Sequence, residues 1–127
     1  MRVIIAGSRS ITNYDLVVKS VQESGFDVTE IVCGGAQGVD SLGERFAKEN
    51  NIKLSYFYAD WKGQGRAAGP IRNEQMGNYS DCLVAVWNGY SKGTRHMIDY
   101  MKKHKKPVYI KYLTDSNLEN FLVCDNV

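Results

Sequence analysis

Three short turns combine glycine with residue types that can hold an anion. They are Ala-Gly-Ser-Arg-Ser at residues 6–10, Cys-Gly-Gly-Ala-Gln-Gly-Val-Asp at residues 33–40 and Gly-Tyr-Ser-Lys-Gly-Thr-Arg at residues 89–95. Each turn follows an apolar run and leads into a helical pattern, so its backbone N–H groups lie at the positive end of a helix. Arginine adds a planar pair of donors that fits phosphate or carboxylate. The pattern predicts a site for a phosphorylated ligand.

The residues expected to contact this ligand come from the three turns and from Gly-Pro-Ile-Arg-Asn at residues 69–73, which opens another helix. They are Gly7, Ser8, Arg9, Gly34, Gly35, Gly38, Asp40, Arg72, Asn73, Gly93 and Thr94. Glycine lets the backbone approach a ligand closely, and hydroxyls donate hydrogen bonds. A structural interpretation stays open beside this one, because acids and threonine are common helix caps and surface arginines often form weak ion pairs.

Three ionisable side chains are candidates for acid–base chemistry. Asp40 and Glu74 are carboxylates in the first turns of predicted helices, and His96 is the only histidine near the expected site. Histidine titrates in a useful pH range, although a lone histidine is often structural. Trp61 and Tyr90 are candidates to stack on a base.

Several classes of site are not expected. The glycine turns match neither the Walker A loop nor the dinucleotide Gly-x-Gly-x-x-Gly pattern. No Gly-x-Ser-x-Gly elbow is present, so a serine hydrolase is disfavoured. The three cysteines lack metal-ligand spacing, and no carboxylate set suggests a cation. We therefore predict no metal and no cofactor.

The apolar runs that position these turns alternate with helical patterns. The runs lie at residues 2–6, 28–33, 54–58, 82–87 and 107–111, and the helical patterns lie at 13–24, 39–50, 70–78 and 94–104. This order predicts an α/β, Rossmann-like three-layer domain, with a mainly parallel sheet of about five strands and helices on both faces. A strand order of 3-2-1-4-5 brings the three glycine turns to one rim, at or beside the switch point where such sheets bind ligands.

The whole chain is expected to form one domain, with a core at residues 1–111 and an extension at 112–127. Residues 60–69 are expected to form a long loop beside the rim. Within the extension, Leu118, Phe121 and Leu122 have helical spacing. This segment is expected to cover the domain or to meet another subunit.

Composition sets the broad class. The 127 residues are 43% hydrophobic and 24% charged, with a formal net charge of +2. That charge is too small to favour a nucleic-acid partner. No secretory leader or bilayer-spanning run is expected, and the cysteines fit free thiols in a reducing compartment. We predict a cytoplasmic protein with no membrane partner.

The four motifs together resemble the YspA/YpsA-related branch of the SLOG superfamily, over roughly residues 1–111. The matching stretches are Ala-Gly-Ser-Arg at 6–9, residues 34–40, residues 69–73 and Ser-Lys-Gly-Thr at 91–94. The resemblance implies a bacterial or phage protein with a Rossmann-like domain that binds nucleotides or nucleotide-derived ligands. It also implies a homo-oligomer.

The superfamily's phosphoribohydrolases carry Pro-Gly-Gly-x-Gly-Thr-x-x-Glu with a catalytic glutamate. Here Gly93 and Thr94 match that motif, while Met97 stands where the glutamate is expected. The resemblance thus favours a binding protein: a sensor, carrier or sequestering protein for a nucleotide. A nucleoside-monophosphate N-glycosidase that uses Glu74, Asp40 or His96 is the first alternative. Single-stranded nucleic-acid binding, as in the DprA members, is the second.

Overall fold

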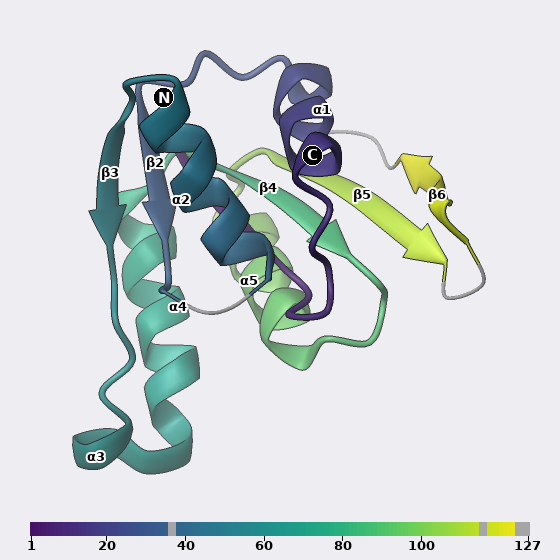
Figure 1. The fold of residues 1–127 in the computed structure, drawn as a ribbon. Coiled ribbons are helices and arrows are strands. Elements are labelled where there is room, and N and C mark those ends of the chain that lie inside the picture. Colours follow the sequence, from purple (N-terminus) through teal and green to yellow (C-terminus); the bar gives the residue numbers. More distant parts are fainter. Residues whose placement is uncertain (36–37, 115–116, 124–127) are drawn as a thin grey trace.

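One sheet lies at the centre of the protein (Figure 1). The computed structural model describes residues 1–35, 38–114 and 117–123. In this part of the chain the strands are β1 (Arg2–Gly7), β2 (Glu30–Cys33), β3 (Lys53–Tyr56), β4 (Cys82–Trp87), β5 (Val108–Thr114) and β6 (Asn117–Val123). Their order is β3-β2-β1-β4-β5-β6, with β1 to β5 parallel and β6 antiparallel to β5. The predicted fold class and the order of the first five strands are confirmed.

Helices cover both faces of the sheet. The helices α1 (Tyr14–Ser24) and α2 (Val39–Glu49) lie in front of it in Figure 1, and α4 (Ala68–Tyr79) and α5 (Lys92–Lys103) lie behind it. Two short pieces, α3 (Trp61–Gln64) and the 3-10 turn η1 (Gly65–Ala67), join β3 to α4. Among the described residues, no helix has the length and apolar character needed to cross a membrane.

The strands bury both of their faces, which explains their nearly continuous apolar sequences. Val3 and Ile5 of β1 pack in the cluster that contains the apolar residues of α1 and α2. Ile4 and Ala6, the alternate residues, pack in the second cluster with α4 and α5. Because successive side chains of a strand point to opposite faces, one short strand supplies both cores.

Two expectations about local structure are wrong. The segment at residues 60–69 is not a long loop, because it contains α3, η1 and the start of α4. The apolar positions near residue 120 do not form a helix, because residues 117–123 form β6. A fifth parallel strand leaves a row of unpaired N–H and C=O groups on its outer edge. The chain reverses and β6 pairs with this edge, as in Lys111↔Val123 and Leu113↔Phe121.

Candidate functional site

The turn after β1 is shaped by contact with the end of β4. A Cβ atom on Gly7 would lie 2.0 Å from the Val86 carbonyl oxygen, so only glycine fits there. Ser8 is buried, and its backbone N–H donates to the same carbonyl at 3.1 Å. The Ser8 hydroxyl accepts a 3.1 Å hydrogen bond from the Asn88 N–H. These contacts fix the backbone from which Arg9 extends at the rim.

A second glycine supports Arg9 from the other side. Gly38, the N-cap of α2, has a φ of 72°, which favours glycine. A Cβ atom on Gly38 would lie 2.5 Å from the Arg9 Cα atom. The turn before α2 therefore packs directly on the backbone of Arg9.

The helix α4 brings Arg72 to the same place. The Arg72 guanidinium donates from Nη1 to the Gly34 carbonyl oxygen and from Nε to Asn73 Oδ1 at 3.1 Å. Asn73 is buried, and its Nδ2 donates to the Gly93 carbonyl oxygen at 3.2 Å. Through these bonds the second glycine turn, α4 and the start of α5 hold Arg72 in one orientation.

The electrostatics of Arg72 favour an anion. Burial lowers the pKa of the half-buried Arg72, the Asp40 carboxylate raises it, and the positive charge of Arg9 lowers it. Among the residues that the structure describes, neither arginine has an ion-pair partner. A bound anion would compensate both the lost hydration and the repulsion between the two cations.

The N-terminus of α5 faces this pair of cations. Ser91 is the N-cap, and its side chain accepts a hydrogen bond from the Thr94 N–H. The expected capping role therefore belongs to Ser91, while Thr94 is buried with its hydroxyl 3.0 Å from the Ser91 hydroxyl. A Cβ atom on Gly93 would meet nothing within 4 Å. The protein itself thus places no steric demand for glycine at this position.

Two cavities lie at the rim, and both contact Arg9 and Arg72. The first has a volume of about 90 Å³ and is lined by Ala6, Gly7, Arg9, Asp40, Arg72, Asn73, Met76, Ser91, Gly93, Thr94 and Met97. The second has a volume of about 390 Å³ and is lined by Arg9, Gly34, Gly35, Tyr58, Ala59, Trp61 and Arg72. The two arginines therefore form a shared border between a small polar site and a larger site with aromatic walls.

Comparison with known proteins shows to which family this chain belongs. The profile of the family described as "YspA, cpYpsA-related SLOG family" matches residues 1–63. Gene 61 protein of Mycobacterium phage D29 is 32% identical over 117 residues, covering 84% of this chain and 93% of the phage protein. The chain belongs to the YspA/cpYpsA-related SLOG family.

A solved structure supports the fold of this SLOG protein. The X-ray structure of DNA processing protein A (DprA) from Streptococcus pneumoniae matches it with a TM-score of 0.71 and 18% sequence identity. The match covers 86% of this chain and 49% of the DprA chain, so the protein spans about half the length of DprA. At this identity the likeness shows a common fold and nothing more specific.

The candidate acid–base residues of the SLOG protein lie in different surroundings. Asp40 is buried, lines the small cavity and accepts a 3.2 Å hydrogen bond from the Gly34 N–H. Glu74 and His96 line neither cavity. His96 Nε2 lies 3.8 Å from Glu74 Oε2, and its Nδ1 lies 3.2 Å from Asn73 Nδ2. His96 is therefore linked to the small cavity through Asn73, which lines it.

The other residues predicted for the site also divide into those that line a rim cavity and those that do not. Trp61 borders the larger cavity, whereas Tyr90 is outside both. Ser8 and Gly38 support Arg9 and line neither of the two rim cavities. Among the described residues, no three His, Cys, Asp or Glu side chains group to hold a metal ion.

Sequence reasoning missed Tyr58 and the capping role of Ser91. Tyr58 follows the third strand at the same rim, so the predicted strand order contained a signal for it. Ser91 stands three residues before Thr94, at the spacing by which an N-cap side chain reaches a backbone N–H in the first helical turn.

Proposed function

We propose that this protein binds a nucleotide or a nucleotide-derived ligand, with a phosphoryl group held in the small cavity. The observation that carries the proposal is the pair of arginines. Arg9 and Arg72 line one cavity that also receives the N-terminus of α5, and no described carboxylate pairs with either of them. Such an arrangement leaves donors and positive charge available to an anion.

The size of the small cavity supports a phosphoryl group as its occupant. Its volume of about 90 Å³ is much smaller than the volume of about 390 Å³ of the neighbouring cavity, which favours a compact anionic group in the small cavity and the bulkier part of a ligand in the larger one. The nucleotide character of the ligand rests on membership of the SLOG family and on the position of the site at the switch point between β1 and β4.

The role of a sensor, carrier or sequestering protein is favoured over hydrolysis by Met97. Its buried side chain lines the small cavity at the position where the related hydrolases are expected to carry glutamate. A thioether neither transfers a proton nor carries a negative charge. The alternative is an N-glycosidase that uses Asp40, and it is favoured by the position of that buried carboxylate in the same cavity.

Single-stranded nucleic-acid binding is the second alternative, and the fold similarity to DNA processing protein A favours it. The low net charge of +2 favours a small ligand. Affinity for a single strand falls with salt, with a slope of about −0.7 per neutralised phosphate. A steep dependence for a fluorescent oligonucleotide, together with no binding of mononucleotides, would support the alternative.

The test begins with the purified protein and a panel of nucleoside monophosphates, ADP-ribose and NAD. Chromatography of the filtrate and of the heat-released bound fraction distinguishes turnover from retention. An intact nucleotide in the bound fraction supports the binding function. Free base formed in proportion to the protein supports hydrolysis, and Asp40→Asn would then abolish turnover while sparing binding.

The same proposal includes a cytoplasmic setting and a homo-oligomeric state. Cys33 and Cys82 are free and buried, and burial raises the pKa of both thiols, as suits reduced, unreactive side chains. Light scattering of the purified protein measures the oligomeric state directly.

A further inference from the structure

Two large aromatic side chains at the rim are exposed although the protein has apolar cores to bury them. Tyr58 is 69% exposed and Trp61 is 55% exposed, and both border the larger cavity. Large exposed aromatic surface beside a cavity commonly marks a binding site. The question is what chemistry these two rings would recognise.

Tyr58 is exposed but held in place. Its ring stacks on that of Tyr56, with centroids 5.4 Å apart and planes inclined by 13°. The hydroxyl of Tyr56 is hydrogen-bonded to Glu44, which raises the pKa of Tyr56. The Tyr58 ring also lies so close to Gly35 that a Cβ atom there would be 2.7 Å from Tyr58 Cε1. Its orientation is therefore fixed before any ligand arrives, which lowers the entropic cost of stacking.

Trp61 is positioned by the short segment between β3 and α4. It is the first residue of α3, whose N-cap Asp60 accepts a 3.0 Å hydrogen bond from the Gly63 N–H. A Cβ atom on Gly69 would lie 3.3 Å from Trp61 Cη2, so the indole rests against the start of α4. The indole thus forms a second aromatic wall of the larger cavity.

The larger cavity shares Arg9 and Arg72 with the small one, so an occupant of the larger cavity lies next to the phosphoryl site. Its volume of about 390 Å³ lies within the range of roughly 300–1,000 Å³ for small-molecule pockets. We propose that the larger cavity is a nucleobase subsite in which the base stacks on Tyr58 and Trp61. The site thereby selects a phosphate that carries a flat heterocycle one sugar away. This inference rests on the function proposed above.

Tyr90 supplies a matched control for this assignment. It is 74% exposed, on the turn before α5, and lines neither rim cavity. Its backbone N–H is bonded to Asn88 Oδ1 at 2.8 Å, so replacing the side chain leaves that turn contact in place. The control removes as much exposed aromatic surface as Tyr58→Ala without touching the proposed subsite.

The experiment compares ribose 5-phosphate with the four common nucleoside 5′-monophosphates, ADP-ribose and NAD by calorimetry. For wild type, the tightest nucleotide is expected to bind more tightly than ribose 5-phosphate. Tyr58→Ala and Trp61→Ala are each expected to weaken that nucleotide by about 5- to 150-fold, from the known range of base–aromatic stacking. They are expected to leave ribose 5-phosphate unchanged, as is Tyr90→Ala for both probes.

The two levels of the proposal fail differently. Equal affinity for ribose 5-phosphate and the nucleotides, or Tyr58→Ala and Trp61→Ala proteins that bind the nucleotide as wild type does, overturns the base subsite and leaves the phosphate site standing. Wild type that binds none of the probes overturns both. Tyr58→Phe keeps the ring and is expected to retain nucleotide affinity, so a loss in that variant would contradict stacking. Circular dichroism establishes that each variant is folded.

Discussion

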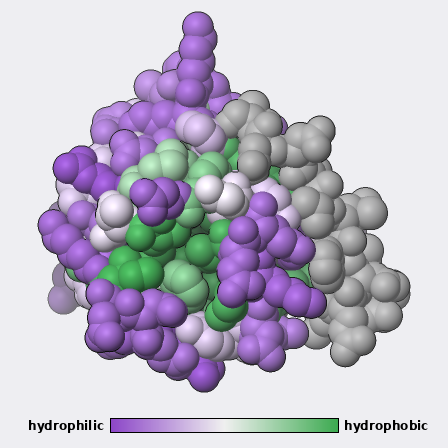
Figure 2. Space-filling view, turned by 90° about the horizontal axis from the view of Figure 1, so that it is seen from above, coloured by the Kyte–Doolittle hydropathy of each residue, from purple (hydrophilic) through white to green (hydrophobic). Residues whose placement is uncertain are grey.

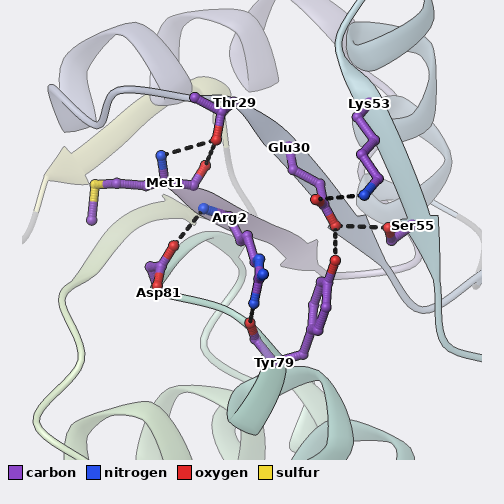
Figure 3. Close-up of polar contacts among 8 residues, drawn as sticks. All are labelled: Met1, Arg2, Thr29, Glu30, Lys53, Ser55, Tyr79 and Asp81. Atoms are coloured by element: carbon purple, nitrogen blue, oxygen red, sulfur yellow. Dashed lines mark hydrogen bonds and ion pairs between the residues drawn. The ribbon is translucent and has the colours of Figure 1, made fainter.

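The two edges of the parallel sheet differ in whether their charged side chains are paired with other groups of the protein. At the edge where the strands begin, polar groups pair with one another (Figure 3). Buried Glu30 accepts hydrogen bonds from Tyr79 and, at 2.7 Å, from Ser55, and it lies 3.4 Å from the Lys53 ammonium. At the edge where the strands end, Arg9 and Arg72 lie together with no ion-pair partner among the described residues.

The starting edge shows what a satisfied network does to a titratable group. Burial would raise the pKa of Glu30, but hydrogen bonds from Tyr79 and Ser55 and the Lys53 charge together lower it. Arg2 donates to the Tyr79 carbonyl at 3.0 Å and stacks over its ring. Figure 2, which views this edge from above, shows apolar residues in the middle and polar residues around them.

The contrast supports the proposal that the edge where the strands end is the binding edge and that the edge where they begin contributes to stability. At the starting edge the protein's own side chains stabilise the buried charge. At the rim, burial lowers the pKa of Arg72, the Asp40 carboxylate offsets part of this effect, and the neighbouring Arg9 lowers the pKa further. A charge that the protein compensates only in part is a candidate to bind a ligand, and a fully compensated charge contributes to folding.

The largest expected effect is a loss of ligand binding when either arginine at the rim is replaced. Arg9→Ala and Arg72→Ala should each weaken binding of a phosphorylated ligand by roughly 10- to 150-fold, because each removes a charge-assisted bond that contributes about 1.5–3 kcal/mol. Calorimetry measures the affinity, and urea unfolding measures the stability. Arg9→Ala should not lower stability, because Arg9 forms no ion pair among the described residues and its removal relieves the repulsion of Arg72.

A matched control removes the same charge elsewhere. Arg45 lies on α2, pairs with Glu49 at 2.6 Å, and lines neither rim cavity. Arg45→Ala should leave ligand affinity unchanged. A comparable loss of affinity in Arg45→Ala would mean that net charge, and not the rim geometry, governs binding.

The next largest effect is expected at the edge where the strands begin. A substitution there should lower the stability of the protein and leave its ligand affinity unchanged. Glu30→Gln should reduce the free energy of unfolding by about 1–3 kcal/mol at neutral pH, because hydrogen bonds to a charged group are weakened in a buried network. The exposed Glu49→Gln should have little effect. If Glu30→Gln were as stable as wild type but bound the nucleotide more weakly, the starting edge would take part in binding. That result would contradict the assignment of stability to one edge and binding to the other.

The pH dependence of the same variant sharpens this comparison. The pKa of Glu30 is lowered in the folded protein from an ordinary value of 4.5. Its contribution to stability is therefore complete above about that pH and is lost as the pH falls through the lowered value. Urea unfolding of wild type between neutral and acidic pH should show this loss, and Glu30→Gln should show a shallower one. The pKa values of Glu23 and Glu44 are also lowered, so part of the dependence of unfolding free energy on pH should remain in Glu30→Gln.

The smallest expected effect has opposite signs for folding and binding. Gly93→Ala should stabilise the protein by roughly 0.5–1 kcal/mol, because glycine is unfavourable within a helix and the added Cβ atom meets nothing within 4 Å. It should weaken phosphate-ligand binding, because the methyl group occupies space next to the phosphoryl site. Thermal unfolding and calorimetry measure the two quantities. A stabilised variant with wild-type affinity would show that the ligand does not approach Gly93.

The rim could be predicted from the sequence because strand order determines it. Alternating elements predict a parallel sheet, and right-handed crossovers bring the turns after β1, β2 and β4 together. The glycine turns then indicate where the backbone packs closely, as Gly7 does on Val86 and Gly38 on Arg9. Arg72 could be predicted because residues 69–73 mark the start of a helix after β3, and in the structure Arg72 lies one turn inside α4, which begins at Ala68.

Other features depend on contacts that no local pattern records. The apolar spacing at residues 118–122 fits a helix, and only the open edge of β5 favours a strand there. Ser8 is a residue type that can donate a hydrogen bond to a ligand. Its hydroxyl instead accepts a hydrogen bond from the backbone N–H of Asn88, 80 residues away in the sequence. Tyr58 follows β3 without a glycine turn, so the strand order predicts the edge of the sheet at which it lies, but no local motif singles out its side chain as a neighbour of Arg9 and Arg72.

The most direct test of the phosphate site compares a nucleotide with its nucleoside in two proteins. Calorimetry would measure the affinity of wild type and of Arg9→Ala/Arg72→Ala for the tightest nucleoside monophosphate and for the same nucleoside without phosphate. We expect the phosphate to increase affinity strongly in wild type and to add little in the double variant. The same increase in both proteins would contradict a phosphoryl site between Arg9 and Arg72.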